Sequence, residues 1–348
     1  MTLSNASLTF AALSILYGAC GNNTVPNNAV ENNQTSEIME NQKHVVIFDT
    51  DANNELDDQH ALIYLLLNGD DFIVPGVTVN ATRNGGDIQG HYDEAHRILK
   101  LAKLDGTVPL YKGANGNFEE IKNDLGEATF DGHGAVDFII EEALKPRKEK
   151  LILLPVGKLT NIALALAKEP KIADHVRIVW LGSNYPEPGE YNQVNDVPSM
   201  NYVLDVEVPF EMVTVRYGKP SGSGAVMINQ DFVKETMPGL GPHIEEPIIG
   251  RHDGEYHTFG DYSVSLFEHI DYHDEDKHRS LFDLVAVAVI KDPQWGQMRL
   301  HPAPTYVNEQ WHERPENDRQ ITIWENFNGE AIVADLLQSL QEPDYVQV

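Results

Sequence analysis

The chain has 348 residues, of which 41% are hydrophobic, so it can bury a large core in one big α/β domain or two smaller ones. Its formal net charge of −29 and its pI of about 4.7 argue against nucleic acid or an anionic membrane surface as the partner, because phosphate binding needs Lys and Arg. The single cysteine, Cys20, excludes an internal disulfide.

The first segment of the chain has the pattern of a bacterial lipoprotein signal. The apolar run Ser7–Cys20 is too short to span a bilayer comfortably, and it ends in small residues before the cysteine. Because no Lys or Arg precedes the run and Tyr17 stands where Leu is usual, an ordinary signal peptide or a cytoplasmic protein stays open. We expect an exported protein, either anchored in the membrane by a lipid on Cys20 or free in the periplasm. The expected parts are a signal (1–20), an Asn-rich flexible tether (21–43) and a catalytic domain (44–348).

From His44 onward, short β-branched runs alternate with segments of helical periodicity. The expected strands are 44–50, 72–80, 150–157, 176–183 and 210–217. The expected helices are about 57–68, 89–103, 134–145, 160–168, 280–291 and 329–340. Several strands are almost continuously apolar, which is typical of strands buried on both faces. The alternation predicts an α/β fold with an open, mostly parallel central sheet flanked by helices and a Rossmann-like core.

Five carboxylates lie within ten residues where the first expected strand meets the first expected helix. Asp49 and Asp51 close the apolar strand, while Glu55, Asp57 and Asp58 follow in the loop and the first helical turn. Helix capping explains the last two but not acids at the end of a buried strand. Like charges this close repel, so a cation should compensate for them. Oxygen ligands without Cys or paired His suit Ca²⁺ or Mg²⁺ better than Zn²⁺.

Polar residues also follow the other expected strands. Asn80 and Asn84 follow the second strand, VGKLTN (156–161) follows the third, and GSNY (182–185) follows the fourth. Each of these residues taken alone is explained by a turn or a helix cap. Because ligands bind beyond the carboxyl ends of parallel strands, the joint pattern indicates a site in one cleft.

A strand that ends in Asp-x-Asp, followed by a loop and by Asp-Asp at the start of a helix, resembles the signature of the inosine-uridine-preferring nucleoside hydrolase family. The resemblance covers most of the chain from about 44 to 293. It implies an open α/β fold, a Ca²⁺ ion, hydrolysis of the N-glycosidic bond of ribonucleosides, and assembly as a homodimer or homotetramer. It continues through GVTV (76–79), VPLYKGA (108–114), GHGAVDFI (132–139), LLPVGKLTNIALAL (153–166), VWLGS (179–183) and FDLVAVAVIKDP (282–293).

The resemblance also implies roles for individual positions. Asp51 would be a metal ligand and the general base that takes a proton from the attacking water. Asp58, Asp283 and the backbone carbonyl of Val156 would complete the metal site. The glycine-flanked His133 is explained equally well as a loop residue. The expected substrate-binding residues are Asp57, Asn80 or Asn84, His133, Asn195, Ser199, Asn201 and Phe282.

Besides the ambiguity between the two asparagines, three features depart from the family pattern. The loop Ala52–Leu56 is about two residues longer than usual and lacks a Pro-Gly pair. Ser199 stands where a ribose-binding Glu is expected two residues before Asn201, and Phe282 stands before Asp283, where members carry His or Trp. We therefore expect an intact metal site with altered sugar and base contacts. Since Phe282 has no proton to donate, we expect it to stack on the leaving base, with a purine preferred, or else to pack in the core.

Two other functions stay open at this point. A phosphatase of the haloacid dehalogenase type also begins with Asp-x-Asp, but it gives the pair Asp57–Asp58 no role. A surface lipoprotein that binds a sugar or nucleoside through Ca²⁺ without cleaving it is the non-enzymatic alternative, although Asp51 argues for catalysis. The segment 251–279, in which Tyr256, His257 and Tyr262 stand out, resembles the mobile segment that covers the base, but a solvated acidic loop explains its composition equally well.

Overall fold

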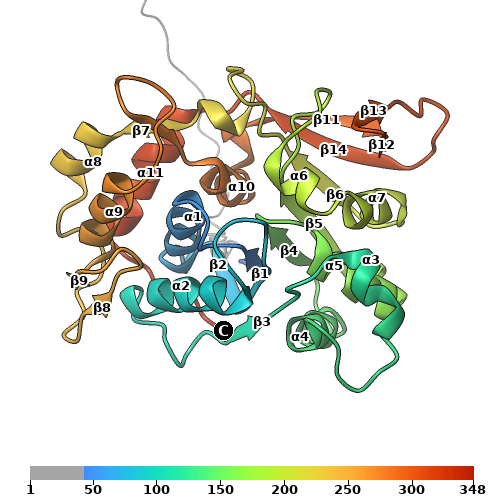
Figure 1. Cartoon of the computed structure of the whole chain (residues 1–348), viewed down its shortest axis with the longest axis horizontal. Helices are drawn as coiled ribbons and strands as arrows, with labels where there is room; N and C mark the ends of the chain where they lie inside the picture. Colours follow the sequence, from blue (N-terminus) through green and yellow to red (C-terminus); the bar gives the residue numbers. More distant parts are fainter. Residues whose placement is uncertain (1–42) are drawn as a thin grey trace, which may run out of the picture. The chain divides into compact units, whose positions relative to one another are not determined.

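The computed structural model describes residues 43–348, so the expected signal with Cys20 and all of the expected tether except Lys43 lie outside the described residues. Neighbouring strands of the central eight-stranded sheet are parallel except for one antiparallel pair at an edge, as the sequence led us to expect. The order is β11 (Gln297–Pro302), β14 (Gln320–Glu325), β6 (Phe210–Val213), β5 (Val176–Leu181), β4 (Leu151–Pro155), β1 (His44–Thr50), β2 (Phe72–Val79) and β3 (Leu110–Lys112) (Figure 1).

Helices cover both faces of this sheet and enclose one hydrophobic core on each side (Figure 1). Successive residues of a strand point to opposite faces, so Val46 and Phe48 enter the first core and Ile47 enters the second. The first core lies under α1 (Asp57–Leu66), α2 (Ile88–Leu101), α8 (Gln230–Thr236), α9 (Phe259–Glu268), α10 (Phe282–Lys291) and α11 (Gly329–Gln341). The second lies under α3 (Phe118–Ile121), α4 (His133–Ala143), α5 (Thr160–Lys168) and α7 (Val197–Asp205).

Two helices of the first face are buried along nearly their whole length and carry acids in their first turns. Every residue of α1 is buried, and α10 is buried from Phe282 to Ile290. The two helices pack against each other. The apolar residues account for this burial, but Asp57, Asp58 and Asp283 are carried into the interior with them. A buried charge is costly unless it is paired, so the starts of α1 and α10 require a compensating partner.

The five expected strands and six expected helices are all present, with shifted ends. The expected strand 210–217 ends at Val213, and Arg216 has a φ of +48°, which is outside the extended region that a strand requires. The pairing of β11 with β14 at the sheet edge depends on contacts that the sequence pattern does not reveal. Further short elements are α6 (Tyr191–Asn195) and the pairs β7 (Met227–Asn229) with β10 (His278–Ser280), β8 (Ile248–Ile249) with β9 (Glu255–Tyr256), and β12 (Thr305–Val307) with β13 (Gln310–His312).

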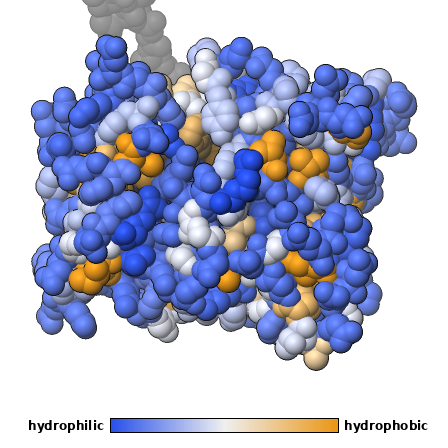
Figure 2. Space-filling model, viewed as in Figure 1, coloured by the Kyte–Doolittle hydropathy of each residue, from blue (hydrophilic) through white to orange (hydrophobic). Residues whose placement is uncertain are grey.

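The surface agrees with the acidic composition. Figure 2 shows a mostly hydrophilic face with scattered apolar patches. Within residues 43–348, no helix combines the length and the apolar character that crossing a membrane demands.

Candidate active site

A pocket opens where β1, β4 and β5 end. Asp51 and Val156 directly follow β1 and β4, Leu181 closes β5, and all three residues line the pocket. Most of the residues predicted for the metal and the reaction meet here. Four carboxylates form what we call the acidic floor: Asp51, Asp57, Asp58 and Asp283. Three aromatic rings form what we call the aromatic wall: Tyr217 and Phe282, which line this pocket, and His273, which lines the adjacent one.

Three members of the acidic floor lie close enough to share one ion. Asp57, Asp58 and Asp283 each place one carboxylate oxygen within 4.8 Å of the others. All three are buried, and Asp51 is only 1% exposed. Burial, and after it the charge of Asp58, raises the pKa of Asp51 and Asp57 well above its ordinary value. Burial followed by the charges of Asp57 and Asp58 does the same for the pKa of Asp283.

Hydrogen bonds from the neighbouring loops hold two of these carboxylates in place. Asp58 accepts from the Thr50 hydroxyl and, at 3.2 Å, from the backbone N–H of Asp51. Burial raises the pKa of Asp58 to about 6, while these bonds and the charge of Arg251 act against the rise. Asp51 accepts from the Asn54 amide and, at 2.5 Å, from the Thr82 hydroxyl.

A glycine keeps the space beside Asp51 open. A Cβ atom on Gly157 would lie 2.7 Å from Asp51 Oδ1 and 3.0 Å from the side chain of Asn80. Any larger residue at this position would therefore push the carboxylate out of its place. The Gly in the sequence VGKLTN is explained by this close approach.

Asp49, the first acid of the Asp-x-Asp pair, has a different role from Asp51. It is fully buried and accepts hydrogen bonds from Thr78 at 2.6 Å, Asn161 at 2.7 Å and Asn80 at 2.9 Å. Burial raises its pKa to about 6, and the three donors act against the rise. Asp49 thus ties β1 to β2 and α5 beneath the pocket.

The predicted asparagines after β2 are both outside the pocket lining. Asn80 is buried and donates to Asp49, and its Oδ1 has no hydrogen-bond partner within residues 43–348. Asn84 is exposed, and its backbone N–H donates to Tyr191 OH at 3.1 Å. Of the two, Asn80 lies next to the acidic floor, since it and Asp51 both face Gly157.

Four other predicted substrate contacts also lie outside the pocket lining. His133 is exposed at the start of α4, where its Nδ1 lies 2.9 Å from Phe130 O. Asn195 accepts from Arg83 N at 2.9 Å. The two remaining residues support neighbouring backbone: Ser199 Oγ donates to Asp196 O at 2.8 Å, and Asn201 Nδ2 donates to Tyr306 O at 2.8 Å.

The sequence analysis missed several pocket residues, among them Tyr217, Glu190 and Asn192. Glu190 is buried and accepts backbone N–H groups from Ser183, Asn192 and Gln193 at 2.7–2.9 Å. Burial raises its pKa. Glu190 and Asn192 have the Glu-x-Asn spacing that was expected to end at Asn201. The pocket therefore contains a Glu-x-Asn pair, although Ser199 stands where the Glu was expected. The Glu-x-Asn spacing is visible in the sequence EYN (190–192). It was not recognised because the helix that follows Glu190, α6, is short and has no apolar periodicity.

The donor set fits a hard divalent cation. The converging atoms are carboxylate oxygens, which Ca²⁺ and Mg²⁺ prefer, and their buried negative charge requires a positive partner. The Val156 carbonyl accepts from Asn192 Nδ2 at 2.7 Å, and a carbonyl has a second lone pair for another partner. Asp51, Asp58, Asp283 and Val156 all line the same pocket.

The aromatic wall lies between this pocket and a second, larger and open pocket. Phe282 and Tyr217 line both spaces. The Phe282 ring centroid lies 5.7 Å from that of Tyr217 at an interplanar angle of 83°, and 6.1 Å from that of His273. The predicted cover residues Tyr256, His257 and Tyr262 line neither cavity, and Tyr262 is fully buried.

Comparison with known proteins agrees with this geometry. The family model described as inosine-uridine preferring nucleoside hydrolase matches residues 46–337. An inosine-uridine preferring nucleoside hydrolase of Leishmania major is 23% identical over 263 residues, which cover 68% of this chain and 78% of that protein. The protein of the same name from Crithidia fasciculata is 34% identical over 89 residues, or 25% of each chain.

Solved structures share the fold. A plant nucleoside hydrolase superposes with a TM-score of 0.67 at 17% identity, covering 87% of this chain and 100% of the other. A purine-preferring ribonucleoside hydrolase from Gardnerella vaginalis superposes with a TM-score of 0.62 at 19% identity, covering 85% and 98%. At this level of identity, the likeness establishes the open, mostly parallel α/β architecture.

Proposed function

The chain belongs to the inosine-uridine preferring nucleoside hydrolase family and is a hydrolase acting on N-glycosyl bonds, and we propose that it cleaves ribonucleosides to free base and ribose with the help of Ca²⁺. The observation that supports the metal is the convergence of buried carboxylates in the acidic floor. We assign Asp51, Asp58, Asp283 and the Val156 carbonyl as the residues that would hold the cation. When bound, the cation would supply Lewis acidity that lowers the pKa of water, and it would offset the buried negative charge.

Asp51 is the proposed general base. It lies at the end of β1 with one oxygen held by Thr82 at 2.5 Å, so its carboxylate has a fixed direction toward the pocket. A carboxylate held within reach of the attacking water can accept its proton in the transition state. Asp51 therefore takes the proton of the attacking water as the glycosidic bond breaks.

The remaining acids and amides of the pocket face the sugar in this proposal. Glycosidic cleavage passes through a state in which positive charge develops on the ribose ring. Asp57 and Glu190 supply negative charge and hydrogen-bond acceptors beside it, and Asn192, whose amide N–H groups are held by Val156 O and Leu181 O, supplies its side-chain oxygen. We propose that this set, rather than Ser199 and Asn201, binds the ribose hydroxyls.

The aromatic wall is the proposed place for the leaving base. A planar base gains from offset or edge-on contact with aromatic rings, and Phe282 and Tyr217 offer such contact between the two cavities. Because Phe282 has no proton to donate, it acts by stacking, and a purine offers the larger overlap.

The experiment is a ribonucleoside screen. The full chain is incubated with a panel of purine and pyrimidine ribonucleosides and Ca²⁺, and free base and reducing sugar are measured by mass spectrometry and a colorimetric assay. We expect equal amounts of base and ribose, with a purine nucleoside cleaved fastest. Release of phosphate from nucleotides without free base from nucleosides would contradict the proposal.

Location and assembly are also proposals. We propose export with a lipid on Cys20, supported by the apolar run and the Asn-rich segment that follows it. The Cys20→Ser variant should then be absent from the membrane fraction of the native host. An unprocessed N-terminus that still begins at Met1 in that host would contradict export. We propose a homodimer or homotetramer by analogy with the family, which sedimentation of the purified chain would measure.

A further inference from the structure

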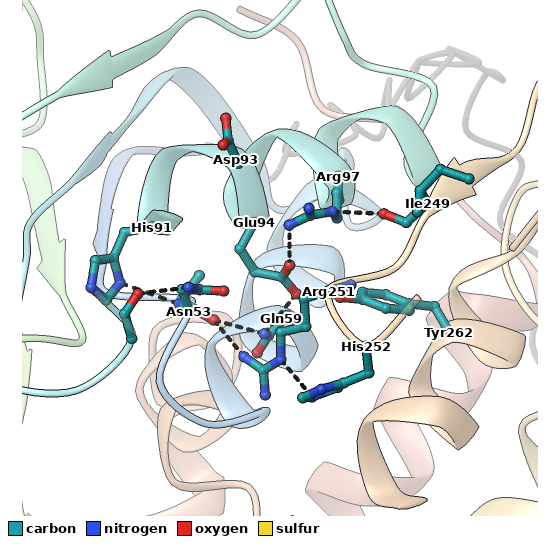
Figure 3. Close-up of polar contacts among 12 residues, drawn as sticks. Asn53, Gln59, His91, Asp93, Glu94, Arg97, Ile249, Arg251, His252 and Tyr262 are labelled. Carbon is teal, nitrogen blue, oxygen red and sulfur yellow. Dashed lines mark hydrogen bonds and ion pairs between the residues drawn. The ribbon is translucent and has the colours of Figure 1, made fainter. Parts of the chain in front are cut away.

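A buried carboxylate outside the pocket joins three helices behind the loop Ala52–Leu56. Glu94 of α2 is fully buried. One of its oxygens accepts from Gln59 Nε2 of α1 at 2.9 Å and from Tyr262 OH of α9 at 2.7 Å. The other accepts from Arg97 Nη1 at 2.8 Å (Figure 3). A buried carboxylate with three donors fixes its partners, because loss of any donor would leave charge unpaired in the interior.

The same network reaches the loop through Gln59 and Arg251, which both donate to the carbonyl oxygens of Ala52 and Glu55. Gln59 Nε2 also donates to Ala52 O at 2.7 Å and to Glu55 O at 3.3 Å. Arg251 donates to the same two oxygens, from Nη1 to Ala52 O at 3.4 Å and from Nη2 to Glu55 O. The backbone N–H of Arg251 donates to Tyr262 OH at 3.3 Å, which closes a ring of contacts through Glu94.

The loop that Arg251 holds is part of the pocket. It joins Asp51 to Asp57, and Asn54 and Glu55 line the pocket directly. It contains no helix or strand, so side chains must supply donors for its carbonyl groups. The fork of a guanidinium suits two neighbouring carbonyls better than a single ammonium does.

We propose that Arg251 is a positioning residue of this site. Its guanidinium fixes the backbone from Ala52 to Glu55, and thereby sets where Asp51 and the first turn of α1 stand in the pocket. The catalytic consequence rests on the proposed function, whereas the hold on the loop does not. Arg251 itself does not line the pocket, so apart from the effect of its charge on Asp58 it acts through the loop.

The test compares Arg251→Met and Arg251→Lys with a matched control, Arg314→Met, in the full chain. Arg314 also donates to two loop carbonyls, Ala303 O at 2.8 Å and Pro304 O at 3.0 Å, but it is outside the pocket. Three quantities are measured: hydrogen exchange of the amides in residues 52–58, kcat and KM on the best nucleoside, and Ca²⁺ affinity by calorimetry.

We expect Arg251→Met to speed exchange in residues 52–58 by about tenfold or more, the effect of losing a hydrogen bond to a charged group. We expect kcat and Ca²⁺ affinity to fall by about 10–100-fold, as for other partners that orient metal-binding groups. The exchange rate, kcat and Ca²⁺ affinity of Arg251→Lys should lie between those of the wild type and of Arg251→Met, because an ammonium group is a single point donor. Arg314→Met should leave loop exchange, kcat and Ca²⁺ affinity within about twofold of the wild type.

Unchanged exchange in residues 52–58 of Arg251→Met would overturn the proposal. A loosened loop with unchanged kcat and unchanged Ca²⁺ affinity would also overturn it, since the loop would then not set the site. If the wild type neither cleaves nucleosides nor binds Ca²⁺, the proposed function fails, and loop exchange alone decides the role of Arg251. If Arg251→Met does not fold, Arg251→Lys, which keeps the charge, carries the same comparison.

Discussion

The acidic floor and two rings of the aromatic wall, Tyr217 and Phe282, line the same pocket, but the two regions are built in different ways. The floor comes from the end of β1 and the starts of α1 and α10, and its members are at most 6% exposed. The wall comes largely from irregular segments, and Tyr217 is 46% exposed. Two floor carboxylates, Asp58 and Asp51, accept hydrogen bonds from the end of β1 and from the segment after β2, whereas the wall residues meet through ring contacts.

This difference assigns the reaction to the acidic floor and the choice of base to the aromatic wall. Regular elements buried on all sides hold charged groups at fixed positions, which a reaction needs. Rings that meet only through contact, on a more exposed surface, leave room to accommodate different bases. We therefore expect changes in the floor to abolish turnover and changes in the wall to alter preference between substrates.

The largest expected effect belongs to Asp51→Asn. The amide keeps the size of the side chain but cannot take a proton, so turnover should fall by about 10²–10⁴-fold, the usual contribution of a general base. Steady-state kinetics on inosine measure the loss, and thermal unfolding checks that the fold is intact. If turnover stays within a few-fold of the wild type, Asp51 is not the general base. Changes in the floor would then not abolish turnover, as the comparison with the wall requires.

A smaller effect, on stability, is expected from a residue beneath the floor. Asn161 donates to Asp49 at 2.7 Å and accepts from the backbone N–H of Ala114 at 2.8 Å, both in the interior. Asn161→Ala leaves the Ala114 N–H unpaired and removes one of the three donors to Asp49, so the free energy of unfolding should fall by about 1–3 kcal/mol. Denaturant unfolding measures the loss. The exposed Asn84→Ala is the control and should change the free energy by less than about 0.5 kcal/mol.

If the two asparagine variants unfold alike, the hydrogen bonds to Asp49 do not support the floor. The contrast between a tightly bonded floor and a loosely held wall would then lose its physical basis.

The smallest expected effect belongs to the wall. Phe282→Ala should lower turnover on purine nucleosides by up to about tenfold, because an aromatic pair contributes about 0.5–1.5 kcal/mol beyond its buried area. Phe282→His should shift relative activity toward pyrimidine nucleosides. Kinetics on inosine and uridine measure both changes, and Phe282→Leu controls for lost volume. If Phe282→Ala keeps its turnover on both substrates and loses only thermal stability, Phe282 packs the core and does not stack on the base.

The sequence predicts the acidic floor better than it predicts the rest of the site. Asp51, Asp57, Asp58 and Asp283 stand at the ends of apolar, periodic segments, so local pattern is enough to bring them together. The central sheet and its flanking helices are predictable for the same reason. The structure confirms these elements and shifts only their ends.

The rest of the site depends on contacts between distant segments. Glu190 was missed because its helix is five residues long and carries no apolar period. Arg251 reaches Glu55 across 196 positions, and no local pattern reports such a pairing. The bonds of Ser199 and Asn201 to neighbouring backbone likewise appear only in three dimensions.

The central claim is that the acidic floor holds one Ca²⁺ ion, and calcium titration tests it most directly. The wild type and Asp58→Ala are stripped with a chelator and titrated with CaCl₂ by calorimetry, with circular dichroism to verify that both are folded. The account predicts one tightly bound Ca²⁺ per wild-type chain and none in Asp58→Ala, because three converging carboxylates are reduced to two. An undiminished stoichiometric Ca²⁺ in folded Asp58→Ala would contradict it.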